Sequence, residues 1–137
     1  MIDIKDYFGQ DNFISHIGAR LVEVSEGYAK ATLEVKEFHL NAYGICQGGA
    51  LFTLADLAFA AAINSHGIST LTTGANITYI KSPLLGDKLC AVAHEIVNHH
   101  RMPFAEVRIT DQYGDLIAFF TASGYRKKPI DQTKLPG

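Results

Sequence analysis

The chain has 137 residues, of which 47% are apolar and 19% are charged, and its formal net charge at pH 7 is -2. Since domains run to roughly 100–200 residues, we expect a single compact domain over residues 1–137, with no room for a separate cofactor domain. A chain with so little net charge is not expected to bind nucleic acid. The longest apolar stretch, residues 50–63, is interrupted by Thr53 and Asp56 and is shorter than the ~20 residues of a bilayer span. It predicts a buried helix, and we expect no membrane partner.

The N-terminus and the cysteines bear on cellular location and redox state. Acidic residues stand among the first ten and no long apolar core follows, so we expect neither a secretory signal nor a basic transit peptide, and a cytoplasmic protein. Cys46 and Cys90 have no CxxC spacing, which favours reduced, mostly buried thiols. His39 lies near Cys46 without a matching second pair of ligands, so we expect no metal site.

The period of the apolar residues changes along the chain. Aromatic and aliphatic residues at helix-like separations predict a helical N-terminal flank over residues 1–18. A period of two over residues 20–35, broken by a turn at Glu26 and Gly27, predicts an antiparallel hairpin. The Leu-, Phe- and Ala-rich segment 50–67 favours a helix that ends near His66 and Gly67. Four further strands are predicted over residues 70–81, 88–98, 104–111 and 116–125, followed by a polar tail over 127–137.

This order of elements predicts an α+β fold. No helices separate the last four strands, so a parallel, doubly wound sheet is excluded and an antiparallel sheet remains. Because the central helix is apolar on most of its circumference, we expect the sheet to wrap around it. Edge strands and leftover apolar surface favour a dimer.

Asp56 is the first candidate functional residue. On a helical wheel it shares a stripe with small or polar residues, namely Gly49, Thr53, Ala60 and Asn64. An ionised carboxylate in apolar surroundings costs several kcal/mol unless it is paired or partly wet. Two interpretations remain open: the stripe meets water or a partner helix, or it lines a wet cleft at a subunit interface where a carboxylate with a shifted pKa acts on a substrate.

The residues just before the helix predict an anion-binding position. Gly48 and Gly49 place backbone N–H groups without intrahelical partners at the positive end of the helix dipole. Their small size allows a ligand carbonyl to approach, and the side-chain amides of Asn41 and Gln47 can donate hydrogen bonds. A glycine pair alone would indicate only a helix start, but here it occurs with two amides and a carboxylate.

The segment HLNAYGICQGGALFTLADLAFAAAINSHG resembles the central motif of the PaaI-type acyl-CoA thioesterases of the hotdog superfamily, and NITYIKSPLLGD is similar to that family's third strand and following turn. The resemblance implies a sheet that wraps one long central helix, and dimers with a continuous sheet and sites at the dimer interface. It implies that Asp56 is the nucleophile or general base, and that the Gly48 N–H polarises the thioester carbonyl. Asn41 would orient the water or the carbonyl.

The resemblance also implies that a hydroxyl residue of the other subunit completes the site. Its position falls at Thr72, where close relatives often have Ser. The clearest departure is Gln47, which stands where the common motif has His. An amide can hold the loop or contact the carbonyl, but it cannot shuttle a proton, so a mechanism with a base at that position is excluded.

Basic residues near strand ends are candidates for binding the phosphates of coenzyme A, or are simply solvated. Lys81, Arg101 and Arg126 are the main ones, with His99, His100, Lys127 and Lys128 beside them. His94 is assigned no role. Gly49 and Gln47 are expected to contact the substrate.

The leading hypothesis is an acyl-CoA thioesterase that needs neither a metal nor an organic cofactor. The alternatives are a noncatalytic acyl-CoA-binding or regulatory hotdog domain and a dehydratase of the same superfamily, against which the missing His at Gln47 argues. The acyl group depends on how Tyr43, Phe52, Phe59 and the N-terminal segment pack in the dimer. The sequence leaves the acyl preference open, and also the choice between a homodimer and a homotetramer.

Overall fold

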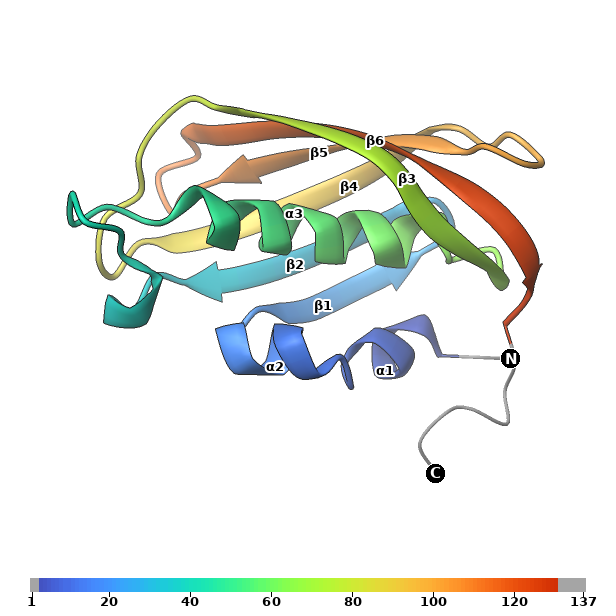
Figure 1. The fold of residues 1–137 in the computed structure, drawn as a ribbon, viewed down its shortest axis with the longest axis horizontal. Coiled ribbons are helices and arrows are strands. Elements are labelled where there is room, and N and C mark those ends of the chain that lie inside the picture. The colour runs from blue at the N-terminus through green and yellow to red at the C-terminus, as the bar shows by residue number, and fades with distance from the viewer. Residues whose placement is uncertain (1–2, 131–137) are drawn as a thin grey trace.

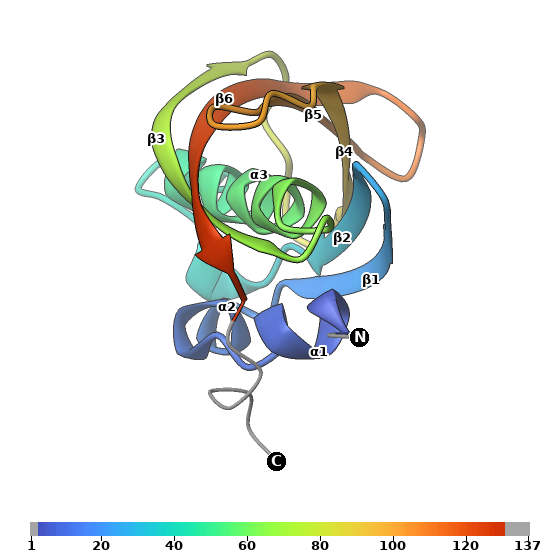
Figure 2. The same ribbon diagram turned by 90° about the vertical axis from the view of Figure 1, so that its right-hand side faces the viewer.

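A computed structural model describes residues 3–130 and shows a six-stranded antiparallel sheet that curves around one long helix (Figures 1 and 2). This confirms the α+β class and the wrapped sheet that the sequence predicts. The helices are α1 (Ile4–Phe8), α2 (Asn12–Ile17) and α3 (Gly48–Ile63), with a short 3-10 turn η1 at Glu37–His39. The strands are β1 (Arg20–Ser25), β2 (Tyr28–Glu34), β3 (Ile68–Tyr79), β4 (Lys88–Val97), β5 (Phe104–Thr110) and β6 (Leu116–Pro129).

The strand order is β1-β2-β4-β5-β6-β3, so β1 and β3 form the two edges of the sheet. Small side chains cover the middle of its inner face, where Ala29 pairs with Ala93 and Ala31 pairs with Ala91. All four alanines are fully buried. Because alanine side chains are short, α3 can lie close against the sheet along its full length, and the core is made where the two meet.

Helix α3 is buried on most of its circumference, as its apolar sequence predicts. Its fully buried side chains include Leu54, Phe59 and Ile63. The sheet covers its back and upper side, and α1 and α2 pack below it, which leaves its front side open in Figure 1. Only Phe52, Thr53, Asp56 and Ala60 among residues 50–63 retain partial exposure.

The element boundaries differ from the predicted ones at both ends of the helix and at the C-terminus. Helix α3 begins at Gly48 and ends at Ile63, since Asn64 caps it by donating from Nδ2 to the carbonyl of Ala60 at 2.8 Å. Strand β6 continues to Pro129, where it pairs with Ile68, so the first residues of the predicted polar tail belong to the sheet. The rest of that tail, residues 131–137, lies outside the described residues.

The N-terminal flank consists of two short helices, each capped by an aspartate. Asp3 accepts a hydrogen bond from the Lys5 N–H at 3.0 Å, and Asp11 accepts one from the Ile14 N–H at 3.1 Å. Helices α1 and α2 both contact α3. Among residues 3–130, no helix combines the length and the apolar character that a membrane crossing requires.

Candidate active site

The loop before α3 is fixed by a buried histidine. His39 is 4% exposed, and its Nδ1 accepts a hydrogen bond from the Lys36 N–H at 2.9 Å. Nε2 must then carry the proton, and it donates to the carbonyl of Ile17 at 2.7 Å. The Gln47 N–H donates to the carbonyl of His39 at 2.7 Å. Both ring nitrogens therefore serve the structure, and His39 connects the N-terminal flank to the start of α3.

Asn41 shapes the loop with one end of its amide and leaves the other end free. Its Oδ1 accepts hydrogen bonds from the N–H groups of Tyr43 and Ile45 at 2.9 and 3.3 Å. Its NH₂ group has no acceptor among residues 3–130, and the side chain is partly exposed. Asn41 can therefore donate to a ligand without releasing the loop.

The first two N–H groups of α3 have no acceptor within the described chain. The Ala50 N–H already bonds back to the carbonyl of Gln47 at 3.0 Å, whereas those of Gly48 and Gly49 do not. The Gln47 side chain makes no capping hydrogen bond and is exposed. The start of α3 thus offers two free donors at the positive end of the helix dipole, which is the arrangement that stabilises an oxyanion.

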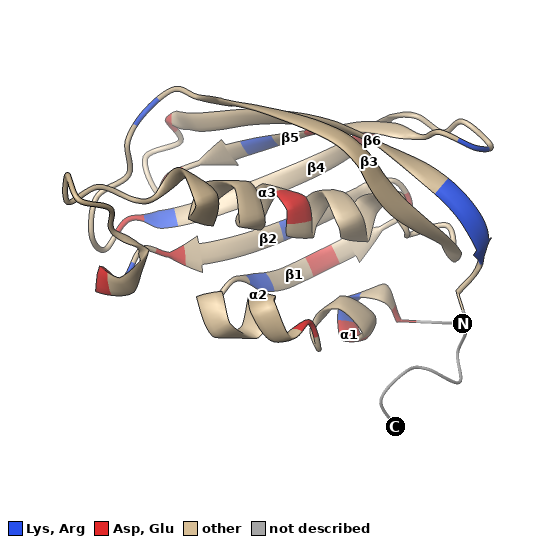
Figure 3. Ribbon diagram, in the orientation of Figure 1, with Lys and Arg blue, Asp and Glu red and all other residues tan. Residues whose placement is uncertain are grey.

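Asp56 is the only charged residue of α3, and it lies on the open side of the helix (Figure 3). The carboxylate is partly buried and has neither a hydrogen-bond partner nor a cation partner among residues 3–130. Burial raises its pKa above the ordinary value, and the nearby carboxylate of Asp11 raises it further. A carboxylate held in this way is a stronger base than one in bulk water.

Thr72 lies on the exposed edge strand β3, next to a break in its pairing with β6 between Thr72 and Gly74. Its neighbour Thr73 is engaged, because the Thr73 hydroxyl lies 3.0 Å from the hydroxyl of Ser123. Within the described chain the Thr72 hydroxyl has no partner. The irregularity thus distinguishes two adjacent threonines that the sequence alone leaves equivalent.

Two of the predicted phosphate-binding residues are engaged elsewhere. Lys81 donates to Asp111 and Asp115 at 2.9 and 2.6 Å, and these hydrogen bonds, that to Asp115 first, raise its pKa. Arg126 is 6% exposed and donates to the carbonyl of His99 at 2.8 Å. We therefore leave Lys81 and Arg126 out of the proposed site, and their contact with phosphate stays a sequence-based prediction.

Arg101 is exposed in the turn between β4 and β5, with its guanidinium 5.9 Å from the ring centre of Tyr125. This turn lies at the opposite end of the sheet from Gly48 (Figure 1). A ligand bound at Gly48 of the same chain is therefore remote from Arg101.

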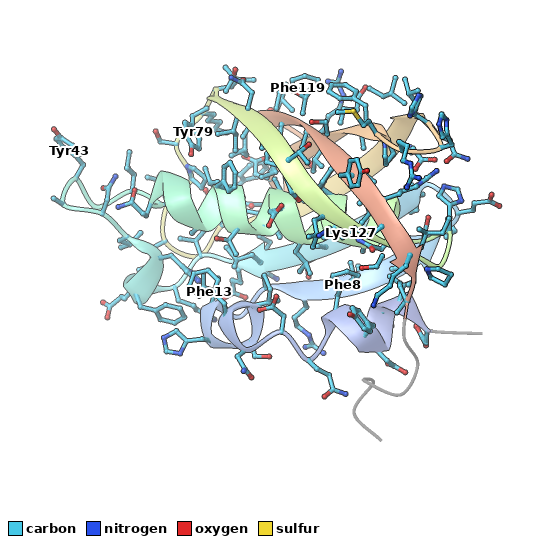
Figure 4. All side chains as sticks on the ribbon, turned by 45° about the vertical axis from the view of Figure 1, so that its right-hand side comes forward. Phe8, Phe13, Tyr43, Tyr79, Phe119 and Lys127 are labelled. Atoms are coloured by element: carbon cyan, nitrogen blue, oxygen red, sulfur yellow. The ribbon has the colours of Figure 1, made fainter. Side chains whose placement is uncertain are left out.

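The aromatic residues expected to shape an acyl pocket differ in their surroundings. Phe59 is fully buried and packs edge-on against Phe120, as does the partly buried Phe52. Tyr43 is exposed at the tip of its loop and points away from the helix (Figure 4). Of the three, only Phe52 borders the open side of α3.

The cysteines, the metal-ligating side chains and the grooves of the described chain offer no second site. Burial raises the pKa of the Cys46 thiol to about 11, which makes it a poor nucleophile. Residues 3–130 contain no cluster of three metal-ligating side chains. A groove of about 840 Å³ lies beside His66 and Pro129, and none of its lining residues belongs to the predicted site.

Two residues at the ends of α3 make contacts that the sequence does not predict. Asn64 belongs to the predicted polar stripe, but it is buried, and its amide bonds to the backbone of Thr70, so it does not line a cleft. Tyr79 donates its hydroxyl proton to the carbonyl of Gly48 at 3.1 Å. No spacing rule indicates that contact, because it joins a strand end to a helix start 31 residues away.

The fold and the site define a class. A sheet wrapped around a helix whose start carries free N–H donors, with a single acid two turns further on, is the architecture of a hotdog thioester hydrolase. Comparison with known proteins agrees: residues 43–118 match the family model "Thioesterase superfamily". The chain belongs to this superfamily, and within it to the PaaI type.

Two relatives carry this assignment. The "Putative esterase" of Archaeoglobus fulgidus is 40% identical over 90% of this chain and 80% of its own length. The acyl-coenzyme A thioesterase PaaI of Escherichia coli is 31% identical over 80% of this chain and 79% of its own length. Its solved structure superposes with a TM-score of 0.85, at 29% identity, over 88% of this chain and 87% of that chain.

A third similar structure contains a ligand. It is a hypothetical thioesterase from Streptococcus pneumoniae with coenzyme A, which superposes with a TM-score of 0.78 at 26% identity over 82% of this chain and 91% of that chain. The same protein has been solved with one aspartate replaced by alanine and with one threonine replaced by alanine, sixteen residues apart.

Proposed function

We propose that this protein hydrolyses acyl-coenzyme A thioesters to the free acid and coenzyme A. The observation that carries the proposal is the unpartnered, partly buried carboxylate of Asp56 on a helix whose first N–H groups are also unpartnered. The Gly48 N–H would polarise the thioester carbonyl, and the carboxylate would activate a water molecule or attack directly. Each contribution is worth roughly a hundredfold or more in rate.

The geometry of α3 supports a site whose two groups come from different copies of the chain. Gly48 and Asp56 are eight residues apart, so they are separated by about 12 Å along the helix at ~1.5 Å per residue. This separation is large for one reacting carbonyl to lie ~3 Å from both groups of the same helix. We therefore place Gly48 and Asn41 of one protomer opposite Asp56 of its partner, in a homodimer.

The edge strand β3 is the surface that supports this dimer. Leu71 on this 12-residue strand and Ile80 directly after it are each 54% exposed, and one edge of the strand is unpaired. Such an edge can pair with another chain, and pairing with a second β3 would cover it. Pairing across β3 would also bring Thr72 of one protomer toward the helix of the other.

Thr72 is the hydroxyl residue we assign to the site. Its free side chain supports this, and so does its separation of sixteen residues from Asp56. The two positions replaced in the Streptococcus pneumoniae thioesterase have the same separation. Thr72 would hold the attacking water or the carboxylate by a hydrogen bond.

A substrate that crosses the dimer interface could bring its phosphates to Arg101 of the second protomer. Gly49 and Gln47 would contact the acyl end, since both are exposed beside Gly48. The similar thioesterase structure that contains coenzyme A supports an acyl-coenzyme A as the ligand. The identity of the acyl group is left to experiment.

The test measures thiol release from aryl, short-chain and long-chain acyl-coenzyme A by wild type and by Asp56→Asn. We expect at least a hundredfold loss of kcat in the variant, with a melting temperature no lower than that of wild type. Asp6→Asn is the matched control, because Asp6 is an exposed aspartate of α1, and it should keep wild-type kcat. Equal activity of Asp56→Asn and wild type overturns the assignment. Binding of acyl-coenzyme A without turnover by wild type would instead indicate a noncatalytic acyl-binding domain.

A further inference from the structure

The two glycines at the start of α3 have different surroundings. A Cβ atom added to Gly48 would lie 2.9 Å from Cζ and 3.0 Å from the hydroxyl oxygen of Tyr79. One added to Gly49 would meet nothing closer than Cγ of Gln47 at 3.8 Å. A side chain at position 48 would therefore have to displace the Tyr79 ring, whereas one at position 49 would meet no close contact.

Tyr79 makes this contact from the last residue of the edge strand β3. Its ring lies over the first turn of α3 (Figure 4), and the side chain remains 51% exposed. The close approach limits how far Gly48 can move relative to the strand. Tyr79 thus joins the open edge of the sheet to the open end of the helix.

The hydroxyl group of Tyr79 adds a directional contact. It donates to the carbonyl oxygen of Gly48 at 3.1 Å. That carbonyl shares a peptide plane with the N–H of Gly49. A carbonyl oxygen has two lone pairs, so it can accept the phenol in addition to a helical hydrogen bond. A hydrogen bond accepted at the carbonyl polarises the peptide unit and strengthens its N–H as a donor.

We infer that Tyr79 is a positioning residue that fixes the peptide unit between Gly48 and Gly49, so that the Gly49 N–H serves as a second donor to the thioester oxyanion beside that of Gly48. This rests on the proposed function. Loss of the Tyr79 hydroxyl alone should destabilise the transition state more than the ground state, because negative charge on the carbonyl oxygen develops during the reaction.

The test compares Tyr79→Phe with wild type and with Tyr113→Phe. Phenylalanine keeps the ring over Gly48 and removes only the hydroxyl. Tyr113 is 77% exposed in the turn between β5 and β6, so it controls for loss of a surface phenol. We expect Tyr79→Phe to lower kcat about fivefold, the effect of one ordinary hydrogen bond, with KM within about twofold and an unchanged melting temperature. Tyr113→Phe should match wild type.

A second measurement does not depend on turnover. The amide proton of Gly49 should move upfield in the nuclear magnetic resonance spectrum of Tyr79→Phe, since it loses polarisation, and Tyr113→Phe should leave it in place. An active wild type with normal kcat in Tyr79→Phe, or an unmoved Gly49 amide, overturns the inference. A wild type that hydrolyses none of the thioesters overturns the proposed function first, and the role of Tyr79 in that reaction with it.

The packing contact is tested by a double-mutant cycle. Gly48→Ala should lower the melting temperature in wild type, because its Cβ would displace the Tyr79 ring. The same substitution should lower the melting temperature clearly less in a Tyr79→Ala background, where that ring is absent. Equal cost in both backgrounds would show that Tyr79 does not restrict Gly48.

Discussion

The two ends of α3 both carry polar groups, but they use them in opposite ways. At the N-terminal end, the N–H groups of Gly48 and Gly49 have no acceptor among residues 3–130. At the C-terminal end, Asn64 is 4% exposed and completely engaged: it donates to the carbonyls of Ala60 and Thr70 and accepts from the Thr70 N–H. The first end is arranged to receive a ligand, whereas the second joins α3 to β3.

The contrast continues in the charged groups near each end. His66 Nε2 lies 2.8 Å from Glu95 Oε1, and Glu95 Oε2 lies 3.6 Å from Arg126, with both of the latter side chains 7% exposed. Oε2 of Glu95 and Nε of Arg126 lack hydrogen bonds within the described chain, yet their opposite charges are paired. Asp56 has no such cation. The comparison teaches that a buried charged side chain with an oppositely charged partner indicates a structural role. A buried charged side chain without such a partner indicates a catalytic role.

The largest effect on stability is expected from breaking the charged cluster. Arg126→Met removes the cation and leaves Glu95 buried without it, so the free energy of unfolding should fall by about 3–5 kcal/mol. Denaturant unfolding at a fixed protein concentration measures this. Arg108→Met is the control, because Arg108 makes an exposed ion pair with Glu106, and it should change stability by less than about 1 kcal/mol. Similar small losses in both variants would contradict the structural role of Arg126.

A smaller loss is expected at the helix end. Asn64→Ala leaves the buried N–H of Thr70 without its acceptor, which should cost about 1–3 kcal/mol. Hydrogen exchange of the Thr70 amide should accelerate at the same time. Asn12→Ala, at an exposed position of α2, should stay within about 0.5 kcal/mol of wild type. If the two variants unfold alike, Asn64 does not connect α3 to β3.

The smallest expected effect has the opposite sign. The pKa of Asp56 is raised in the folded chain, so stability is greatest while its carboxyl is protonated and is lost as pH rises through the folded-state pKa. Asp56→Asn should therefore melt at a higher temperature than wild type at pH 7, and this gain should shrink toward acid pH. Thermal melts of both proteins across pH 3–8 test the sign. A lower melting temperature for the variant at pH 7 would show that the carboxylate has a stabilising partner.

Much of the fold follows from patterns that involve neighbouring residues. Period-two alternation located the strands, and the apolar segment around Asp56 located the helix, because both signals depend on burial of one face. The strand ends do not follow from local patterns: β6 extends to Pro129 because Ile68 pairs with it, and no local pattern shows that pairing.

Part of the candidate site could be predicted because some of its residues stand out in a local sequence pattern. Asp56 and Gly48 stand out locally, as a charge within an apolar helix and as a glycine at a helix start. Lys81 and Arg126 could not be assigned, because a cation near a strand end is equally suited to phosphate or to a carboxylate. Here Lys81 meets Asp111, a contact between residues 30 positions apart.

The amino-acid sequence by itself determined the class of fold, the helix with its lone acid, and the glycine pair at the helix start, since each depends on residue type and short-range spacing. Only the tertiary structure decided which polar groups remain free. Partners such as Tyr79 for Gly48, Ser123 for Thr73 and Glu95 for Arg126 come from distant parts of the chain. A hydrogen bond or an ion pair forms only where folding brings its two groups within about 3–4 Å.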